Sequence, residues 1–447
     1  MSRESNPTSA DHKQSRGESG ANRRDFLKTG TASVAAGSLL GTFAGSAGVY
    51  AAGDDILKVG LVGCGGRGTG AANNALKADP YAKLVAMGDV FPEKIERSIK
   101  SLKAQKPVAD RVEVDEDHRF VGLDAYQKVI DSVDVVLLCT PPGFRPVQLR
   151  AAVDAGKHIF TEKPMATDSP GVRSVMESVR IAKEKNLAMV AGFCWRYDSA
   201  KRAFYDRILS GDIGQVQSAY GTYLTSPVKP MPPADTRPEG ITDLEWMVRN
   251  WYNFTWLSGD GLVEQACHTV DWVAWAFGDT PPASCTAVGG RQIPAEGGNI
   301  FDHIEVNYKW EDGRRGFLAQ RQIAGCHNEN NFYVLGTGGQ GTMTRRGTET
   351  IGKERWRYKG PTPNMYDVEH QELFLSIRDG KPLNDGDRMV NSTLMAIMGR
   401  MAGYTGKEVT WEQALNSKDQ LVPDITDGWD TPVEFRPMAR PGLTPLV

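Results

Sequence analysis

A glycine-rich turn between a strand and a helix constrains the fold of this chain more than any other feature. Residues 56–62 are an apolar run that predicts a buried strand, and the chain continues as Gly63-Cys64-Gly65-Gly66-Arg67-Gly68 before a helical stretch that ends near Leu76. This G-x-G-x-x-G pattern, in this position, is typical of dinucleotide-binding folds. The first glycine permits the tight turn, the second lets the backbone approach a pyrophosphate, and the third lets helix and strand pack closely. Free N–H groups at the start of the helix favour phosphate binding.

An acidic residue at the end of the next strand predicts the cofactor. The apolar run 83–88 ends at Asp89, which lies 21 residues beyond Gly68. A carboxylate at this position accepts hydrogen bonds from the adenosine ribose and repels the additional phosphate of NADP. No arginine follows Asp89 closely. The sequence therefore predicts NAD as the cofactor, with NADP as the less favoured alternative.

Apolar strands keep alternating with helical segments as far as residue 193. The run 134–139 ends in Thr140-Pro141, and a strand at 158–161 ends in Glu162-Lys163-Pro164. Alternation of this kind predicts a parallel, doubly wound sheet, in which ligands bind beyond the carboxyl ends of the strands. We therefore assign both motifs to the cofactor site, and residues 53–193 to an NAD-binding Rossmann domain.

The pattern changes after residue 193. Residues 302–310 alternate strictly between apolar and polar side chains, which predicts a half-buried antiparallel strand. Further strands are expected at 215–224, 283–291, 316–324 and 331–336, and covering helices at about 366–379 and 388–404. We expect residues 194–447 to form a second domain that carries the substrate site and the contacts between subunits.

The first 52 residues are expected to be an export signal. Arg23-Arg24 is followed by Phe-Leu-Lys, and residues 29–50 carry no charge and lead to small residues near Ala52. The paired arginines resemble the twin-arginine signal, so the expected partner is the twin-arginine export machinery and the expected location is the periplasm. Five glycines in the 22 positions 29–50 make this segment a weak membrane span, which argues against a stable membrane anchor. Because this route carries folded proteins, the cofactor is expected to be bound before export.

Charge and cysteine spacing exclude two classes of site. The net charge of −3 and the isoelectric point near 6.2 argue against a nucleic-acid partner. The six cysteines form no Cys-x-x-Cys pair and no cluster with zinc spacing, so no metal site is expected. A chain of 447 residues is long enough for the two domains that the motifs predict.

Taken together, these motifs resemble the Gfo/Idh/MocA oxidoreductases. The resemblance rests on the glycine fingerprint, the Thr-Pro and Glu-Lys-Pro motifs and the segment Gly261–Asp271, and it covers about residues 55–410. It implies an α/β protein with an N-terminal Rossmann domain, whose sheet is parallel and doubly wound, and a C-terminal α/β domain with a large, mostly antiparallel sheet. The open face of that sheet usually forms the substrate side or a subunit interface, so a homo-oligomer is expected. Exported members of the glucose–fructose oxidoreductase type bind their cofactor tightly.

The resemblance also implies the catalytic residues. Lys163 matches the active-site lysine, His268 matches the acid/base histidine, and Glu264 stands where many members have aspartate. On an expected helix over 265–277, Glu264, His268 and Asp271 share one face, so a carboxylate would fix the tautomer of His268 and raise its basicity. Lys163, close to a positively charged nicotinamide, is expected to have a lowered pKa and to stabilise a developing alkoxide.

Candidate substrate residues carry alternatives. Arg196 and Tyr197 follow the last Rossmann strand, and Arg196 could instead form an interdomain ion pair. Asp271 shares the helix face with His268, and His327 could contact substrate or be a turn residue. The aromatic residues between 246 and 256 could stack on sugar rings or form a core or an interface.

These features predict an exported NAD-dependent dehydrogenase that acts on a sugar or a glycoside. One alternative is an NAD-dependent glycosidase, in which transient oxidation acidifies a neighbouring C–H bond, elimination expels the aglycone and the hydride returns. Lys163 and His268 could serve both reactions. A second alternative is a cofactor-binding protein without catalytic activity, which would hold NAD and turn over no carbohydrate.

Overall fold

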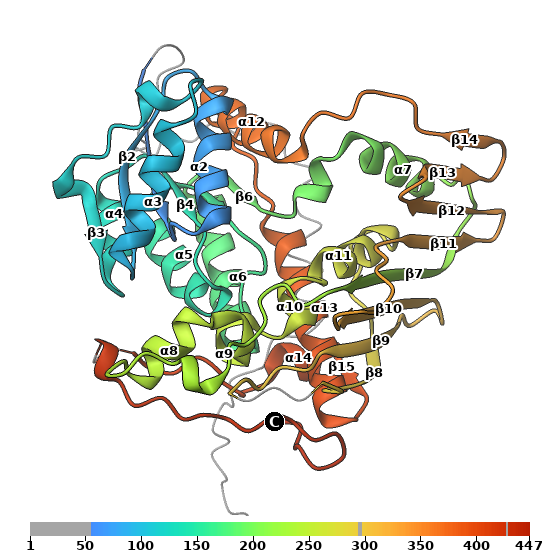
Figure 1. The fold of residues 1–447 in the computed structure, drawn as a ribbon. Helices are drawn as coiled ribbons and strands as arrows, with labels where there is room; N and C mark the ends of the chain where they lie inside the picture. Colours follow the sequence, from blue (N-terminus) through green and yellow to red (C-terminus); the bar gives the residue numbers. More distant parts are fainter. Residues whose placement is uncertain (1–54, 294–296, 426–427) are drawn as a thin grey trace, which may run out of the picture.

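Two sheets lie on opposite sides of the molecule, with helices between and around them (Figure 1). The computed structural model describes residues 55–293, 297–425 and 428–447, so the predicted export signal lies outside the described residues. Within the described residues, no helix is both long enough and apolar enough to cross a membrane.

The first sheet is parallel throughout, as the alternation predicts. Its order is β3-β2-β1-β4-β5-β6, the arrangement of dinucleotide-binding Rossmann folds. The strands are β1 (Leu57–Val62), β2 (Ala82–Asp89), β3 (Arg119–Val121), β4 (Val135–Leu138), β5 (His158–Thr161) and β6 (Met189–Ala191). Its helices are α2 (Gly66–Ala78), α3 (Pro92–Lys103), α4 (Ala125–Asp131), α5 (Arg145–Asp154) and α6 (Ser169–Glu184).

Burial on both faces explains why these strands are continuous apolar runs rather than alternating ones. In β4, Val135 and Leu137 point into one hydrophobic core while Val136 and Leu138 point into another. All four side chains are completely buried. Helices on each side of a parallel sheet exclude water from both faces, so neither face tolerates polar residues.

The second sheet has nine strands in the order β14-β13-β12-β11-β7-β10-β9-β8-β15. Every neighbouring pair is antiparallel except β7 and β10, which confirms the predicted mostly antiparallel sheet. The strands are β7 (Val216–Thr225), β8 (Ser284–Gly290), β9 (His303–Lys309), β10 (Arg315–Gln322), β11 (Phe332–Gly336), β12 (Gly339–Thr344), β13 (Gly347–Ile351), β14 (Arg355–Arg357) and β15 (Val409–Thr410). Strands β12 to β14 were not expected, because their glycine-, threonine- and arginine-rich sequence lacks an apolar alternation.

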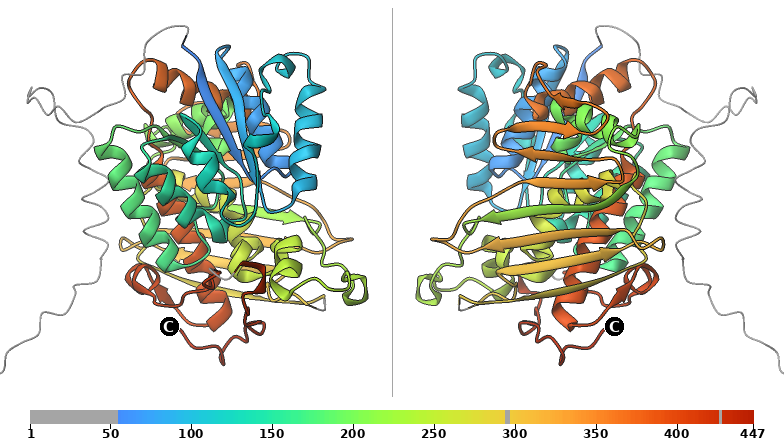
Figure 2. Two further views of the ribbon diagram at one scale, coloured as in Figure 1. Left: turned by 90° about the vertical axis from the view of Figure 1, so that its left-hand side faces the viewer. Right: turned by 90° about the vertical axis from the view of Figure 1, so that its right-hand side faces the viewer.

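Helices cover only one face of this second sheet. They include α7 (Ser199–Leu209), α10 (Gly261–Glu264), α11 (Cys267–Ala276), α13 (Gly386–Thr405) and α14 (Trp411–Asn416). The outer face is bare in the right-hand view of Figure 2 and exposes Tyr220, Tyr333, Leu335 and Val288. Contact with another subunit through this face stays a prediction.

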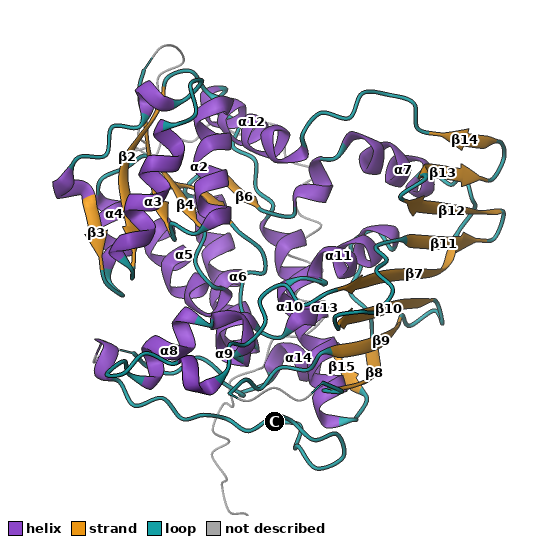
Figure 3. Cartoon of the chain, in the orientation of Figure 1, coloured by secondary structure: helices purple, strands orange, loops and turns teal. Residues whose placement is uncertain are grey.

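The two expected late helices are present, and one of them returns to the first domain. Helix α12 (Met365–Arg378) packs on α2, where Arg378 forms an ion pair with Asp79 at 2.7 Å and Asn74 donates to Asp367. A segment from the second half of the chain therefore contributes to the surroundings of the glycine-rich turn (Figure 3).

A third core joins the two halves of the molecule below the sheets. Helices α8 (Asp243–Arg249) and α9 (Thr255–Ser258), which follow β7, lie under the Rossmann domain in Figure 1. The C-terminal tail, residues 417–447, runs beneath them. Phe91, Leu244, Phe254 and Trp256 are buried in this core, and tail residues including Trp429 pack against it. We call α8, α9 and the preceding loop, residues 226–258, the cover.

Candidate active site

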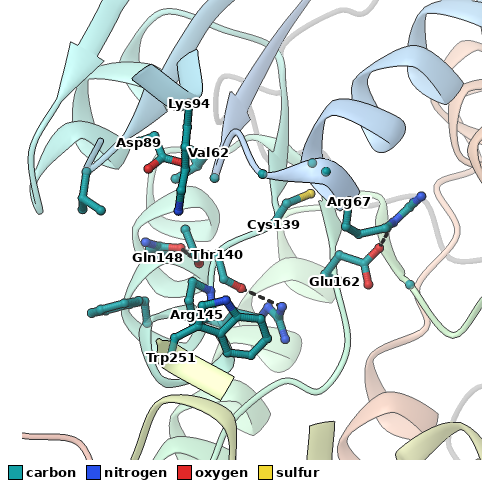
Figure 4. A pocket seen from close by; sticks show the side chains of 18 of the residues that line it. Val62, Arg67, Asp89, Lys94, Cys139, Thr140, Arg145, Gln148, Glu162 and Trp251 are labelled. Atoms are coloured by element: carbon teal, nitrogen blue, oxygen red, sulfur yellow. Dashed lines mark hydrogen bonds and ion pairs between the residues drawn. The ribbon is translucent and has the colours of Figure 1, made fainter. Parts of the chain in front are cut away.

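A cavity of about 740 Å³ separates the carboxyl edge of the Rossmann sheet from the cover and from α10 and α11. Its size is in the range of ligand sites, roughly 300–1,000 Å³. The predicted residues that line it are Gly63, Gly65, Gly66, Arg67, Gly68, Asp89, Thr140, Pro141, Glu162, Lys163, Glu264 and His268. Figure 4 shows its Rossmann wall. The structure thus brings residues of five separate motifs to one cavity.

The glycine-rich turn fits a dinucleotide. A Cβ atom on Gly65 or Gly66 would meet nothing within 4 Å, so the backbone there faces open cavity. A Cβ atom on Gly68 would lie 1.9 Å from the carbonyl oxygen of Gly63, and Gly63 itself has a φ of +92°. The first and third glycines are therefore required by packing and conformation, and Gly65 and Gly66 leave room for a phosphate at the start of α2.

Asp89 is held in place at the end of β2. Its carboxylate accepts hydrogen bonds from the backbone N–H of Cys64 at 2.7 Å and of Phe91 at 3.0 Å. Two lysines that the sequence analysis did not weigh also line the cavity: Lys94, which extends beside Asp89 (Figure 4), and Lys229 from the cover. Burial lowers the pKa of Lys229, and the charge of Lys94 lowers it further. This end of the cavity therefore combines one carboxylate with two ammonium groups.

Lys163 is bound to Glu264 rather than free. Its ammonium group donates to the Glu264 backbone carbonyl and lies 3.2 Å from Oε1 of the Glu264 carboxylate. Burial opposes the charged form, yet the Glu264 carboxylate raises the pKa of Lys163 above its usual value. The expected lowering of this pKa is therefore not found in the protein without cofactor. Gln265 donates to the other carboxylate oxygen at 2.6 Å and accepts from Tyr223 at 2.7 Å, which fixes Glu264.

His268 lines the cavity without a carboxylate partner. The expected continuous helix is interrupted, since α10 ends at Glu264 and α11 begins at Cys267. The Glu264 side chain contacts Lys163, and among the described residues Nδ1 of His268 is buried with no hydrogen-bond partner. Burial lowers the pKa of His268 well below its usual value, and the charge of Lys163 lowers it further. The structure therefore corrects the predicted pairing: Glu264 orients Lys163, and His268 is a neutral imidazole.

The Glu-Lys-Pro motif is tied to the glycine-rich turn. Nε of Arg67 donates to Glu162, and the Arg67 guanidinium lies over the Tyr366 ring at 4.6 Å and 3.6 Å from Glu369. Tyr366 and Glu369 belong to α12, and the sequence analysis did not connect this helix with the site. Burial raises the pKa of Glu369 well above its usual value.

Arg145 holds the two strand-end motifs together. Its buried guanidinium donates to the backbone carbonyl of Thr140 at 2.6 Å and to that of Pro164. Pro164 itself does not line the cavity. Arg145 therefore joins the end of β4 to the residue that follows Lys163.

None of the four predicted substrate residues lines the cavity. Arg196 donates to both carboxylate oxygens of Asp271 at 2.8 Å and also binds Asp279. Arg196 is 3% and Asp271 1% exposed, and the alternative reading of Arg196 as an ion-pair residue describes this placement. Tyr197 is buried and donates to Asp385 at 2.8 Å.

His327 is the fourth. It lies in the exposed turn after β10, and its Nε2 is 3.7 Å from Glu329. Of the aromatic residues before α10, Trp251 and Tyr252 do line the cavity, whereas Phe254 and Trp256 form the third core.

Replacing Glu264 with glutamine is expected to move the alkaline limb of the pH profile of kcat/KM to lower pH. The wild-type carboxylate raises the pKa of Lys163, so the ammonium form persists as the pH rises. Without that charge, burial opposes the ammonium form against only the weaker effects of groups such as Glu162, so Lys163 loses its proton at lower pH. The matched control is Glu305→Gln on the exposed side of β9, which is expected to leave the profile unchanged. An unshifted profile for Glu264→Gln would contradict the assignment.

Two family profiles cover most of the described chain. Residues 57–193 match the oxidoreductase family with a NAD-binding Rossmann fold, and residues 202–341 match the GFO/IDH/MocA C-terminal domain. The chain belongs to the GFO/IDH/MocA oxidoreductase family. The predicted resemblance is thereby confirmed, and the matched N-terminal part of the chain is that of an NAD-binding Rossmann family.

Relatives of this GFO/IDH/MocA protein differ in reaction. Inositol 2-dehydrogenase of Rubrobacter xylanophilus is 26% identical over 301 residues, which are 65% of this chain and 74% of that protein. A glycosyl hydrolase family 109 protein of Shewanella amazonensis is 28% identical over 218 residues, 44% of this chain and 46% of the relative.

Solved structures show the same fold. Levoglucosan dehydrogenase in complex with NADH and levoglucosan has a TM-score of 0.63 at 20% identity, over 80% of this chain and 99% of that one. A 3-ketoreductase from Actinomadura kijaniata in complex with NADP has a TM-score of 0.59 at 16% identity, over 78% of this chain and 98% of that one.

Proposed function

We propose that this protein is an NAD-dependent oxidoreductase that oxidises a CH–OH group of a sugar, polyol or glycoside. The observation that carries the proposal is the position of the Lys163 ammonium and the neutral His268 imidazole in one cavity with the glycine-rich turn. The relatives named as inositol dehydrogenases and the levoglucosan dehydrogenase fold support this substrate class.

The two side chains have complementary roles in this reaction. A bound nicotinamide supplies the two-electron redox chemistry. Lys163, whose raised pKa keeps it charged, donates a hydrogen bond to the reacting oxygen and stabilises its developing negative charge. His268, whose lowered pKa keeps it neutral, accepts the hydroxyl proton. Trp251 and Tyr252 of the cover form the facing wall.

The test is a screen of sugars, polyols and glycosides with the purified protein, read by absorbance of the reduced cofactor and by mass spectrometry of the products. An oxidised carbohydrate, lighter by two hydrogens, is the expected product. Binding of NAD with no turnover of any carbohydrate would favour the catalytically idle alternative.

The glycosyl hydrolase family 109 relative favours one second candidate, an NAD-dependent glycosidase. The same Lys163 and His268 would serve a transient oxidation followed by elimination of the aglycone. A single assay with aryl glycosides distinguishes the two functions. A glycosidase releases the phenol with no acceptor and no net change in NAD, whereas a dehydrogenase accumulates reduced cofactor or needs a carbonyl acceptor.

Replacing Asp89 with alanine is expected to weaken NADH binding by about 10- to 100-fold. It is also expected to reduce the ratio of the affinity for NADH to the affinity for NADPH. A hydrogen bond to a charged group is worth roughly 1.5–3 kcal/mol, and removing the carboxylate also removes repulsion of the additional phosphate. Lys94 and Lys229 remain at this end of the cavity to attract that phosphate. Fluorescence titration with both nucleotides measures the change, and Asp312→Ala, in the turn after β9, is the control. Tighter binding of NADPH than of NADH by the wild type would refute the choice of NAD.

We further propose that the protein is exported to the periplasm with its cofactor bound. The paired arginines at 23 and 24, ahead of an uncharged segment, support export of the folded protein. The double substitution Arg23→Lys and Arg24→Lys is expected to abolish export and leave folded protein in the cytoplasm, as measured by cell fractionation. Normal export of this variant would exclude the twin-arginine route.

A further inference from the structure

The C-terminal tail, which lies outside the family-matched part of the chain, packs against the loop that follows Asp89. The matched segments end at residue 341, whereas the tail begins after α14 and spans 417–447. It is anchored at defined points: the Asp168 carboxylate accepts from the backbone N–H of Leu421 at 2.8 Å, and the Arg436 carbonyl accepts from Asn299 at 2.9 Å. These bonds fix the tail to the start of α6 and to the loop before β9.

Trp429 is the tail residue that contacts Phe91, two residues beyond Asp89. Its ring stacks on Phe91 with centroids 5.9 Å apart and an interplanar angle of 20°. Phe91 is 3% exposed and caps the start of α3. A partly buried tryptophan from the end of the chain therefore covers a loop of the Rossmann domain.

Phe91 connects this stack to Asp89 and Lys94, two of the three charged side chains at that end of the cavity. Its backbone N–H donates to the Asp89 carboxylate at 3.0 Å, and its ring lies 4.6 Å from the Lys94 ammonium. The cover contributes as well, since the Arg249 guanidinium lies 4.1 Å from the same ring. A shift of Phe91 would therefore displace Asp89 and Lys94 together.

We propose that Trp429 is a positioning residue for the cofactor, which acts through Phe91 to fix Asp89 and Lys94 and thereby slows dissociation of the nucleotide. The inference rests on the dinucleotide binding of the proposed function and deepens the proposal of a retained cofactor. It does not depend on which substrate is oxidised.

The physical reason is pre-organisation. A loop that is already held in its bound geometry loses less conformational freedom when the nucleotide binds. Trp429 is not among the described residues that line the cavity, and it packs against the third core, to which the lining residues Val248 and Trp251 also belong. Its loss is therefore expected to change nucleotide affinity and release without changing the chemistry at Lys163 and His268.

The experiment compares Trp429→Ala, Trp429→Phe and wild type by stopped-flow fluorescence, with bound NADH displaced by excess NAD. The free energy of one stacked aromatic pair corresponds to a change of about 3- to 10-fold in an equilibrium constant. We expect Trp429→Ala to release NADH about 3- to 10-fold faster, and Trp429→Phe, which keeps a stacking ring, to restore most of the wild-type rate. Turnover at saturating cofactor is expected to stay within about twofold of wild type.

Trp356→Ala is the matched control, because Trp356 packs under Arg207 at the far edge of the second sheet. A release rate for Trp429→Ala equal to that of the control would overturn the proposal, as would a loss of turnover with unchanged release. If Trp429→Ala does not fold, Trp429→Leu, which keeps apolar volume without a ring, provides the same comparison. A failed carbohydrate screen would leave these release rates unaffected and would count only against the proposed substrate class.

Discussion

Replacing Lys163 with alanine is expected to lower turnover by about 10²–10⁴-fold while the protein still binds cofactor. Lys163 is 7% exposed, and Glu264 holds its ammonium group at the cavity wall. Alanine at this position removes the positive charge that would stabilise the reacting oxygen. His268→Ala is expected to cause a loss of similar size, because it removes the neutral base. Steady-state kinetics on the carbohydrate found by the screen, with NADH titration in parallel, measures both effects.

Lys83→Ala is the control for this prediction. Lys83 pairs with Glu113 on the surface, away from the cavity, and its loss is expected to leave turnover unchanged. Near wild-type turnover of either Lys163→Ala or His268→Ala would exclude that residue from catalysis. A loss of NADH binding in step with turnover would instead assign it to the cofactor site alone.

Replacing Arg196 with alanine is expected to destabilise the fold by about 3–5 kcal/mol, the usual cost of removing one partner from a buried ion pair. The guanidinium is buried and satisfies both Asp271 and Asp279, and it also lies over the Trp275 ring at 4.5 Å. Its removal leaves the Asp271 carboxylate buried, with the Ser392 hydroxyl, at 2.7 Å, as its remaining side-chain donor among the described residues. Chemical denaturation of the variant measures the loss.

Arg180→Ala is the matched control for Arg196. Arg180 pairs with Glu177 and Glu184 on the exposed face of α6, where water replaces the lost contacts, so little change is expected. If Arg196→Ala has wild-type stability but binds the carbohydrate more weakly, Arg196 is a substrate-binding residue after all. Unfolding without a specific effect on substrate would fit the ion pair that the structure shows.

Sequence patterns predicted those parts of the site that depend on contacts between neighbours in the chain. The glycine-rich turn could be recognised because Gly63 and Gly68 are required by the turn that they themselves form. The alternating segment at 302–310 predicted β9, because one face of the strand packs in the core and the other faces solvent. The helix expected over 265–277 is present as α11, Cys267–Ala276, but Glu264 lies outside it. The carboxylate and carbonyl of Glu264 contact Lys163, a partner 101 residues away that spacing along the helix does not indicate.

The sequence by itself determined the Rossmann domain, the antiparallel second sheet and the residues offered to the site. Only the tertiary structure decided which of those residues meet. Arg196 and Asp271 have the residue types of a substrate site, yet both are buried, and their desolvated charges compensate each other. Trp429 and Phe91 lie at opposite ends of the chain and carry no local signal of their contact. Pairings over such distances follow from the packing of whole elements, which periodicity and spacing along the chain do not specify.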